Sequence, residues 1–290
     1  MERDDWVATL EYWQTCGVDL LSGDRLDFPS PTAPPPHTPG PNPATPPFQP
    51  FKPPESHPAR PAQHPPPAGA SQDAVQKKAS PVLSSAEGSL PALLKSDQKK
   101  SLLTQREEEA SNCRRCELHL TRSQAVFGVG DADAPVVFVG EGPGADEDRM
   151  GEPFVGAAGK LLDKMLYAVG LTREQVYIAN VIKCRPPGNR NPLPEEVALC
   201  QHFLIDQLQT IQPKAIFCLG KFALLTLMGY DGPVGKARNQ PFSWQGIPVI
   251  ASFHPAYYLR TPSKKGAAWQ DLIRLQKLLE SLEKKRGKKG

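Results

Sequence analysis

Short apolar runs alternate with amphipathic segments through the second half of the chain. Runs rich in valine, isoleucine and phenylalanine predict buried strands at 135–140, 176–182, 214–220 and 247–253. Apolar residues at helical spacing predict helices over 98–110, 157–170, 194–208, 221–228 and 267–285. Strands separated by helices predict βαβ units. We therefore expect an α/β fold with three αβα layers, in which a central four-stranded parallel sheet lies between helices.

The first third of the chain has a different pattern. Of 33 prolines, 18 fall within residues 29–67, where aliphatic side chains are almost absent, so no packed core is expected there. We divide the chain into a short amphipathic helix (1–22), a Pro-rich disordered linker (23–100), one compact domain (101–285) and a basic tail (286–290). We expect the linker to act mainly as a spacer, although its proline-rich segments are also suited to a proline-recognising module.

Composition excludes several classes of protein. No run of 18 apolar residues exists, so no transmembrane helix is predicted. The acidic N-terminus lacks the apolar region of a secretory signal, and we expect a cytoplasmic protein. In that reducing compartment the six cysteines are expected to be metal ligands, core residues or catalytic groups rather than disulfides. The net charge of +3 is too small to identify a partner.

Three chemically unusual peptides directly follow predicted strands. They are GEGPGADEDRMGEPFVG (140–156), KCRPPGNRNP (183–192) and HPAYYLRTP (254–262). The carboxyl ends of parallel strands share one edge of a sheet, and ligands bind along that edge. We therefore expect these three loops to converge on one site.

Four cysteines form a second group. Cys113 and Cys116 are a C-x2-C pair, which can hold one metal centre by spacing alone. Cys184 follows the second predicted strand, and Cys200 lies 16 residues later inside a helix. Four thiolates suit Zn²⁺ or an iron–sulfur cluster, and the spacing does not decide between them. Cys218 lies in an apolar strand and is expected to be a core residue.

These motifs, in this order, resemble the family 4 uracil-DNA glycosylases. The resemblance rests on the C-x2-C pair, GEGPG-x3-D-x2-GEPFVGAAGKLLD, YIANVIKCRPPGNRNP, a cysteine in the next helix, and HPAYYLR, and it covers residues 105–283. It implies a uracil-DNA glycosylase-like fold, uracil-containing DNA as the partner, and a monomer. It also implies a [4Fe–4S] cluster held by Cys113, Cys116, Cys184 and Cys200.

The resemblance further implies the reaction and the residues of a uracil pocket. The reaction is hydrolysis of the N-glycosidic bond of a deoxyuridine that has been flipped out of the DNA, which leaves an abasic site for base excision repair. The amide of Asn180 is expected to read N3–H and O4 of uracil, Phe154 to stack on the ring, and His254 to stabilise the charge on O2. The implied uracil-binding residues are Glu141, Gly142, Pro143, Phe154, Asn180 and His254.

An acidic group is needed to position water and to stabilise the sugar cation. Family 1 relatives carry an aspartate in the first motif, whereas this chain has Gly142 there, preceded by Glu141. We expect Glu141 and Glu147 to take this role beside His254. The alternative for Glu147 and Asp148 is a solvated pair of acids at a helix start. No lysine occupies a position that suggests Schiff-base chemistry, so a monofunctional glycosylase is expected.

DNA contacts are expected from the second and third loops. Aromatic and leucine side chains would fill the gap left by the flipped base, and cationic side chains would meet phosphates. The candidates are Lys183, Arg185, Asn189, Arg190, Tyr257, Tyr258, Leu259 and Arg260, with Lys264 and Lys265 nearby.

Two alternative functions would replace glycosylase activity, and a third could accompany it. A uracil-DNA binding protein of the same superfamily becomes covalently attached, but it carries a KRIH-type insertion where PFVGAAGKLLD here continues directly into a helix. A nucleotide-binding or redox module is disfavoured because GEGPG lacks the G-x-G-x-x-G spacing and no P-loop is present. An interaction protein, in which residues 1–100 dock a repair or replication protein, is compatible with catalysis.

Overall fold

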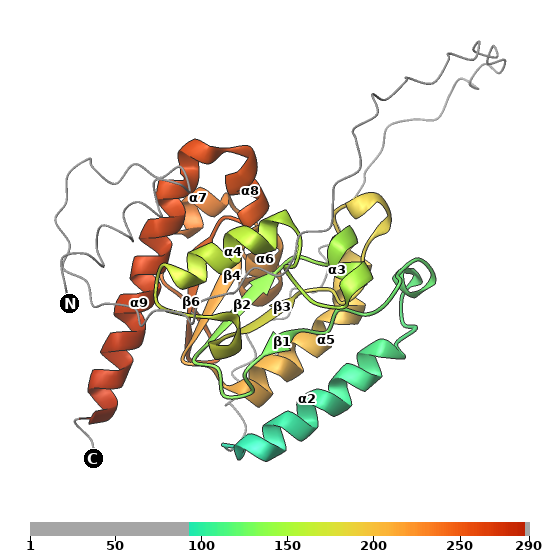
Figure 1. The fold of residues 1–290 in the computed structure, drawn as a ribbon, viewed down its shortest axis with the longest axis horizontal. Helices are drawn as coiled ribbons and strands as arrows, with labels where there is room; N and C mark the ends of the chain where they lie inside the picture. The colour runs from blue at the N-terminus through green and yellow to red at the C-terminus, as the bar shows by residue number, and fades with distance from the viewer. Residues whose placement is uncertain (1–92, 288–290) are drawn as a thin grey trace, which may run out of the picture. The chain divides into compact units, whose positions relative to one another are not determined.

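The computed structural model describes residues 93–287 (Figure 1). The expected N-terminal helix and most of the Pro-rich linker lie outside the described residues and stay predictions. The first described helix, α2 (Ser96–Ser111), begins before the domain boundary expected at residue 101. Its start is fixed by Gln98, whose side-chain oxygen accepts from the backbone N–H of Lys95 at 3.0 Å.

Within the described part of the chain, six strands form one sheet in the order β1-β3-β2-β4-β6-β5. The four central strands are parallel: β2 (Val136–Gly140), β3 (Tyr177–Asn180), β4 (Ala215–Leu219) and β6 (Ile247–Ser252). They confirm the predicted parallel sheet. The short edge strands β1 (Val129–Gly130) and β5 (Phe242–Trp244) are antiparallel to their neighbours and were not predicted. Two or three residues are too few to show the alternating pattern of a strand.

Helices cover both faces of this sheet (Figure 1). Successive side chains of β2 point to opposite faces. Val136 and Phe138 pack with α4 (Ala157–Tyr167), α8 (Pro255–Arg260) and α9 (Lys265–Gly287). Val137 and Val139 pack with α2, α5 (Pro194–Ile211) and α6 (Lys221–Met228). The two apolar clusters confirm the expected three layers.

Two helices occupy peptides that were expected to be loops. α3 (Ala145–Met150) lies within the peptide after β2, and α8 forms most of HPAYYLR. α8 starts because His254 caps it and Pro255 occupies its first position, where a missing N–H costs nothing. The remaining short elements are α7 (Val234–Ala237) and the 3-10 turns η1 (Glu117–Leu120), η2 (Arg173–Gln175), η3 (Pro187–Asn189) and η4 (Pro262–Lys264).

Length and apolar character decide whether a helix can cross a membrane. Between residues 93 and 287, no helix combines the length and the apolar character needed to cross a membrane.

Candidate active site

The peptides after β2, β3 and β6 meet around one cavity of about 430 Å³. They converge because the carboxyl ends of these parallel strands lie at the same edge of the sheet. All six expected uracil-binding residues line the cavity: Glu141, Gly142, Pro143, Phe154, Asn180 and His254. Four other candidates also line it: Glu147, Asn189, Arg190 and Arg260.

Asn180 ends β3 and is 2% exposed. Its side-chain oxygen Oδ1 is buried and has no hydrogen-bond partner. Gly140, at the end of β2, leaves room for this oxygen, because a Cβ there would lie 2.4 Å from Oδ1 and 2.6 Å from the Phe154 ring. A buried acceptor without a donor costs about 1–3 kcal/mol. The cavity therefore offers an unpaired acceptor to any ligand that carries an N–H group.

Phe154 lies beside that oxygen in an unusual backbone conformation. Its φ is 56°, in the left-handed region that bulky residues rarely adopt. Its ring is stacked on the ring of His254, with centroids 5.3 Å apart and planes 29° from parallel. The conformation places an aromatic ring in the cavity wall, where a flat ligand can stack on it.

His254 presents one defined ring nitrogen to a ligand. Its Nδ1 accepts from the backbone N–H of Ala256 at 3.2 Å, so in the neutral ring the proton is on Nε2. Burial lowers the pKa of His254 to about 4, and the nearby Arg260 contributes in the same direction. At neutral pH His254 is therefore an uncharged N–H donor in the cavity wall. The sequence alone had left this protonation state undecided.

Glu141 is the half-buried acid of the cavity. Removal from water raises the pKa of its carboxyl group to about 7. This carboxyl group therefore exchanges its proton near neutral pH, a property suited to acid–base work.

The raised pKa of Glu141 predicts a pH-dependent effect on stability. The folded state holds the proton more tightly than the unfolded chain, so stability is greatest below the unfolded pKa of 4.5 and falls as pH rises through about 7. Glu141→Gln mimics the protonated form. We expect it to stabilise the protein at pH 8 by about 2 kcal/mol, or roughly 4–8 °C in Tm, and to have little effect at pH 4.5.

Thermal unfolding at the two pH values measures this difference, with Glu152→Gln on the exposed part of the same peptide as the control. An equal gain at both pH values would show that the carboxyl group is not perturbed by burial.

Glu147 and Asp148 do not form the solvated acid pair that was the alternative for them. The Glu147 carboxylate accepts from three backbone N–H groups, those of Gly144 at 3.1 Å, Val155 at 3.0 Å and Gly156 at 2.9 Å. Asp148 is 4% exposed and accepts from both N–H and O–H of Ser123. Neither is a solvated helix-start acid. With its oxygens bonded in this way, Glu147 holds the turn that carries Phe154.

Lys183 does not lie where a phosphate contact was expected. It is 1% exposed, and its ammonium donates to the carbonyl of Asn180 at 2.9 Å and to Oε1 of Gln207 at 2.7 Å. Burial lowers the pKa of Lys183 to about 7. Instead of facing DNA, Lys183 ties the end of β3 to α5. No local pattern indicates this contact, because Gln207 lies 24 residues away.

Other DNA-contact candidates differ in whether their side chains are bonded or buried inside the protein or face outward. The Arg190 guanidinium makes two hydrogen bonds, of 2.9 and 2.6 Å, to the carboxylate of Glu196. Tyr258 is fully buried with its hydroxyl 3.0 Å from that of Ser252, so it is not available to fill a gap in DNA. Leu259, at 41% exposed, is the outward-facing apolar side chain of α8.

Of the remaining candidates, Asn189 and Arg260 line the cavity and the others lie outside its lining. Arg260 is exposed, and Asn189 accepts from Nε of Arg185 at 2.7 Å. Tyr257 is half-buried and stacks on Phe253. Lys264 is exposed and Lys265 is half-buried.

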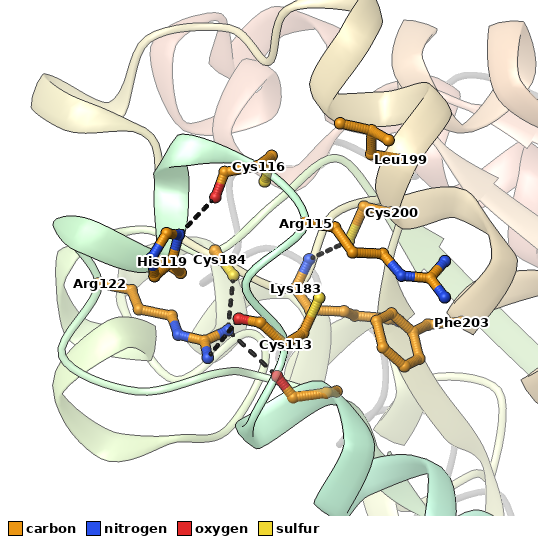
Figure 2. Close-up of a pocket in the computed structure, with 11 residues that line it drawn as sticks. Cys113, Arg115, Cys116, His119, Arg122, Lys183, Cys184, Leu199, Cys200 and Phe203 are labelled. Carbon is orange, nitrogen blue, oxygen red and sulfur yellow. Dashed lines mark hydrogen bonds between the residues drawn. The ribbon is translucent and has the colours of Figure 1, made fainter.

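The four candidate cysteine ligands surround a second, smaller pocket (Figure 2). Cys113 and Cys116 come from the segment between α2 and η1, Cys184 follows β3, and Cys200 lies in α5. Burial raises the pKa of Cys116, Cys184 and Cys200, and neighbouring thiols of the group add to each of these shifts. The structure therefore brings the Cys113–Cys116 pair together with two cysteines that are distant from it in the sequence. Cys218 is buried in β4, as expected of a core residue.

Hydrogen-bond donors point at two of these sulfurs (Figure 2). Nη1 of Arg122 lies 2.9 Å from Sγ of Cys184, and the backbone N–H of Lys183 lies 3.3 Å from Sγ of Cys200. Arg122 also donates to the carbonyls of Ala110, Ser111 and Cys113. In residues 93–287 no three side chains of His, Cys, Asp or Glu form a group that could hold a single metal ion.

The geometry defines a general class of protein. An α/β domain with a polar, partly aromatic cavity at its strand ends is suited to receive a flat ring with its own donors and acceptors, such as a nucleobase. The family model described as the uracil DNA glycosylase superfamily matches residues 127–273.

Curated relatives narrow that class further. A type-4 uracil-DNA glycosylase of Thermotoga maritima is 49% identical over 160 residues, covering 54% of this chain and 83% of the relative. One from Archaeoglobus fulgidus is 46% identical over 178 residues, covering 59% and 89%. A type-5 uracil-DNA glycosylase of Pyrobaculum aerophilum is 33% identical over 144 residues, covering 44% and 63%. The chain belongs to the uracil-DNA glycosylase superfamily and, within it, to the type-4 uracil-DNA glycosylases.

Proposed function

We propose that this protein is a monofunctional uracil-DNA glycosylase, which flips deoxyuridine out of DNA and hydrolyses its N-glycosidic bond. The products are free uracil and an abasic site, the starting point of base excision repair. The observation that carries this proposal is the unpartnered Oδ1 of Asn180, buried in one cavity with Phe154 and His254. Uracil has an N3–H group that this oxygen can accept.

Recognition of uracil follows from the same amide. Oδ1 of Asn180 accepts from N3–H while the amide nitrogen donates to O4. Cytosine has an acceptor at N3 and an amino group at position 4, so it would meet like groups at both places. Phe154 supplies the stacking face. The backbone N–H groups near Glu141 and Gly142 reach a uracil oxygen, and Pro143 stiffens the turn that carries them.

Bond cleavage requires stabilisation of two developing charges. Negative charge grows on N1 and O2 of uracil, where the Nε2–H group of neutral His254 can donate a hydrogen bond in a dry pocket. Positive charge grows on the sugar, and an ionised carboxylate beside it favours that charge and orients the attacking water. We assign this role to Glu141, because the oxygens of Glu147 accept from the backbone.

A monofunctional reaction is supported by the make-up of the cavity wall. Among the described residues that line it, none is a lysine, so no amine is placed there to attack the sugar. Borohydride added to a reaction in progress should therefore trap no covalent complex with DNA.

DNA contact is proposed for the surface around the cavity mouth. Arg260 and Arg185 are the candidates for phosphate contact, and Asn189 lies beside them in the wall. Leu259 projects from the first helix after β6 and would fill the gap left by the flipped base. An adjacent apolar side chain lowers the cost of holding that base outside the stack.

A [4Fe–4S] cluster is proposed for the cysteine pocket. The donors fit, since Cys113, Cys116, Cys184 and Cys200 line one pocket and N–H groups point at the sulfurs of Cys184 and Cys200. Such a cluster takes one thiolate per iron and does not need all four to converge on one point. When bound, it would act as a structural cross-link between the segment after α2, the peptide after β3, and α5.

Removal of one ligand is expected to release the cluster. Cys200→Ser should lose the broad visible absorbance and the iron of the purified protein, and lower its Tm. Cys218→Ala removes an equally buried cysteine in β4 and should keep both iron and absorbance. Iron analysis with visible spectroscopy measures the difference. Full iron content in Cys200→Ser would remove Cys200 from the proposed ligand set.

The proposed activity is tested by a cleavage assay. Purified protein is mixed with a uracil-containing oligonucleotide or its thymine counterpart, and alkali then breaks the DNA at abasic sites. We expect breaks at uracil only. A stable covalent adduct without turnover would favour the covalent uracil-DNA binding protein instead. Deletion of residues 1–92, which leaves α2 (Ser96–Ser111) whole, tests whether the segment before it recruits a repair or replication protein, and predicts unchanged cleavage in vitro with altered behaviour in cells.

A further inference from the structure

The turn that carries Phe154 is held in a conformation that it would not adopt alone. Its φ of 56° is unfavourable for a residue with a bulky side chain. Such a conformation persists only when the surroundings fix it. Because the direction of the Phe154 ring depends on this backbone angle, the contacts that fix the turn also aim the ring.

The backbone N–H groups of the turn are held by Glu147. Its carboxylate accepts from the backbone N–H groups of Val155 at 3.0 Å and Gly156 at 2.9 Å, just after Phe154. These bonds hold the outgoing chain against α3. The carboxylate is an acceptor and cannot bind the carbonyl groups of Pro153 and Phe154, which need a donor.

The carbonyl groups of the turn are held by Arg173, which belongs to η2 and follows α4 in the sequence. Its guanidinium donates to the carbonyl of Pro153 at 2.6 Å and to the carbonyl of Phe154 at 3.0 Å. Successive carbonyls of an extended chain point to opposite sides, so both can face one guanidinium only if the chain turns between them. The two bonds therefore select the turned conformation.

Asp163 and Gly159 of α4 hold Arg173 and the turn in place. Asp163, in α4, accepts from Nη1 of Arg173 at 2.9 Å and so anchors the guanidinium to that helix. Gly159 lets the turn lie directly on α4, because a Cβ there would be 1.7 Å from the carbonyl oxygen of Phe154. Arg173 is thus a planar bridge between a helix and two backbone carbonyls, and the compact ammonium of lysine, whose donors all lie on one nitrogen, reproduces it only in part.

We propose that Arg173, anchored by Asp163, is a positioning residue that aims the ring of Phe154 at the extruded base. Arg173 is not among the residues that line the cavity, so it would act through the backbone of the turn. This inference rests on the proposed glycosylase function. It adds a residue that belongs to none of the sequence motifs and lies 19 positions after Phe154.

The test uses Arg173→Gln, Arg173→Lys and Asp163→Asn in the full-length, iron-loaded protein. The control is Arg106→Gln, which removes an arginine paired with Glu109 and Asp206 and far from the cavity in sequence. Four quantities are measured: the single-turnover excision rate at saturating protein, inhibition by free uracil, affinity for undamaged DNA, and Tm.

Misplacement of a group by about 1 Å can cost up to 10²-fold in rate. We therefore expect Arg173→Gln to lower the single-turnover rate and weaken inhibition by uracil by about 10- to 100-fold each, with affinity for undamaged DNA unchanged. Arg173→Lys should recover part of both losses. Asp163→Asn should give a smaller change in the same direction, and Arg106→Gln none.

Two results would overturn the positioning role. One is a normal rate and normal uracil inhibition in Arg173→Gln. The other is a loss that follows Tm alone and disappears when the assay temperature is lowered. If Arg173→Gln does not fold, Arg173→Lys and Asp163→Asn decide by the same criteria. Wild-type protein that excises no uracil would instead refute the proposed function, and the positioning role with it.

Discussion

Replacement of His254 by alanine is expected to lower the single-turnover rate of uracil excision by about 10²–10³-fold. Removal of one preorganised donor from a site where negative charge develops typically has this effect. The structure fixes the orientation of the ring, because Nδ1 accepts from the N–H of Ala256 while His254 lines the cavity, which leaves Nε2 as the donor. The loss should appear in the rate at saturating protein more than in affinity for DNA.

Two comparisons make the His254 prediction specific. His254→Gln keeps an N–H donor and should recover part of the rate, whereas alanine recovers none. The pKa of about 4 predicts that the wild-type rate shows no ionisation of His254 between pH 6 and 8. Rates measured across that range, with and without the substitution, would reveal a charged histidine if the two profiles differ in shape. Such a difference would contradict the neutral-donor assignment.

Replacement of Asn180 by aspartate should reduce both the rate and the selectivity of base excision. The new side chain has nearly the same shape, but it loses the N–H donor expected for O4. We expect uracil excision to fall by about 10²-fold or more, since a site built around a hydrogen bond strongly rejects a mismatched partner. A carboxyl group buried at this position tends to keep its proton, and it can then pair with N3 and the amino group of cytosine.

The selectivity of Asn180→Asp is measured with oligonucleotides that carry uracil or cytosine at one position. We expect the ratio of the two excision rates to fall by at least about tenfold relative to wild type. Asn180→Ala, which removes both polar groups, should lower the uracil rate without gaining any activity on cytosine. An unchanged ratio in Asn180→Asp would show that the base is read by other groups.

The central sheet and the cavity could be predicted from the sequence for one physical reason. Buried parallel strands are continuous apolar runs, and chemically unusual residues directly after them must share an edge. This placed Asn180 and His254 together from patterns of only a few residues. The helix in HPAYYLR was missed because its start depends on a hydrogen bond from Ala256 to the His254 ring rather than on periodicity.

The charged residues were harder to predict because their partners are distant. A run of acids such as ADED gives no sign that Glu147 binds the backbone at Val155 and Gly156. Lys183, in a loop rich in cations, suggested a phosphate contact, yet its ammonium is bonded to Asn180 and Gln207 inside the protein. Packing of β3 against α5 decides where this side chain lies, and the residues next to Lys183 in the sequence do not indicate that packing.

During synthesis, the proposed uracil pocket cannot be completed until most of the domain has been made. β4 lies between β2 and β6 in the sheet, so His254 comes to lie beside Phe154 only after both later strands have joined. His254 is made 74 residues after Asn180. Domains generally fold as units while the chain is being made. A partly made chain therefore carries the amide and the aromatic ring but lacks the donor for O2, and it should not cut glycosidic bonds before β6 and His254 have been made and have joined the sheet.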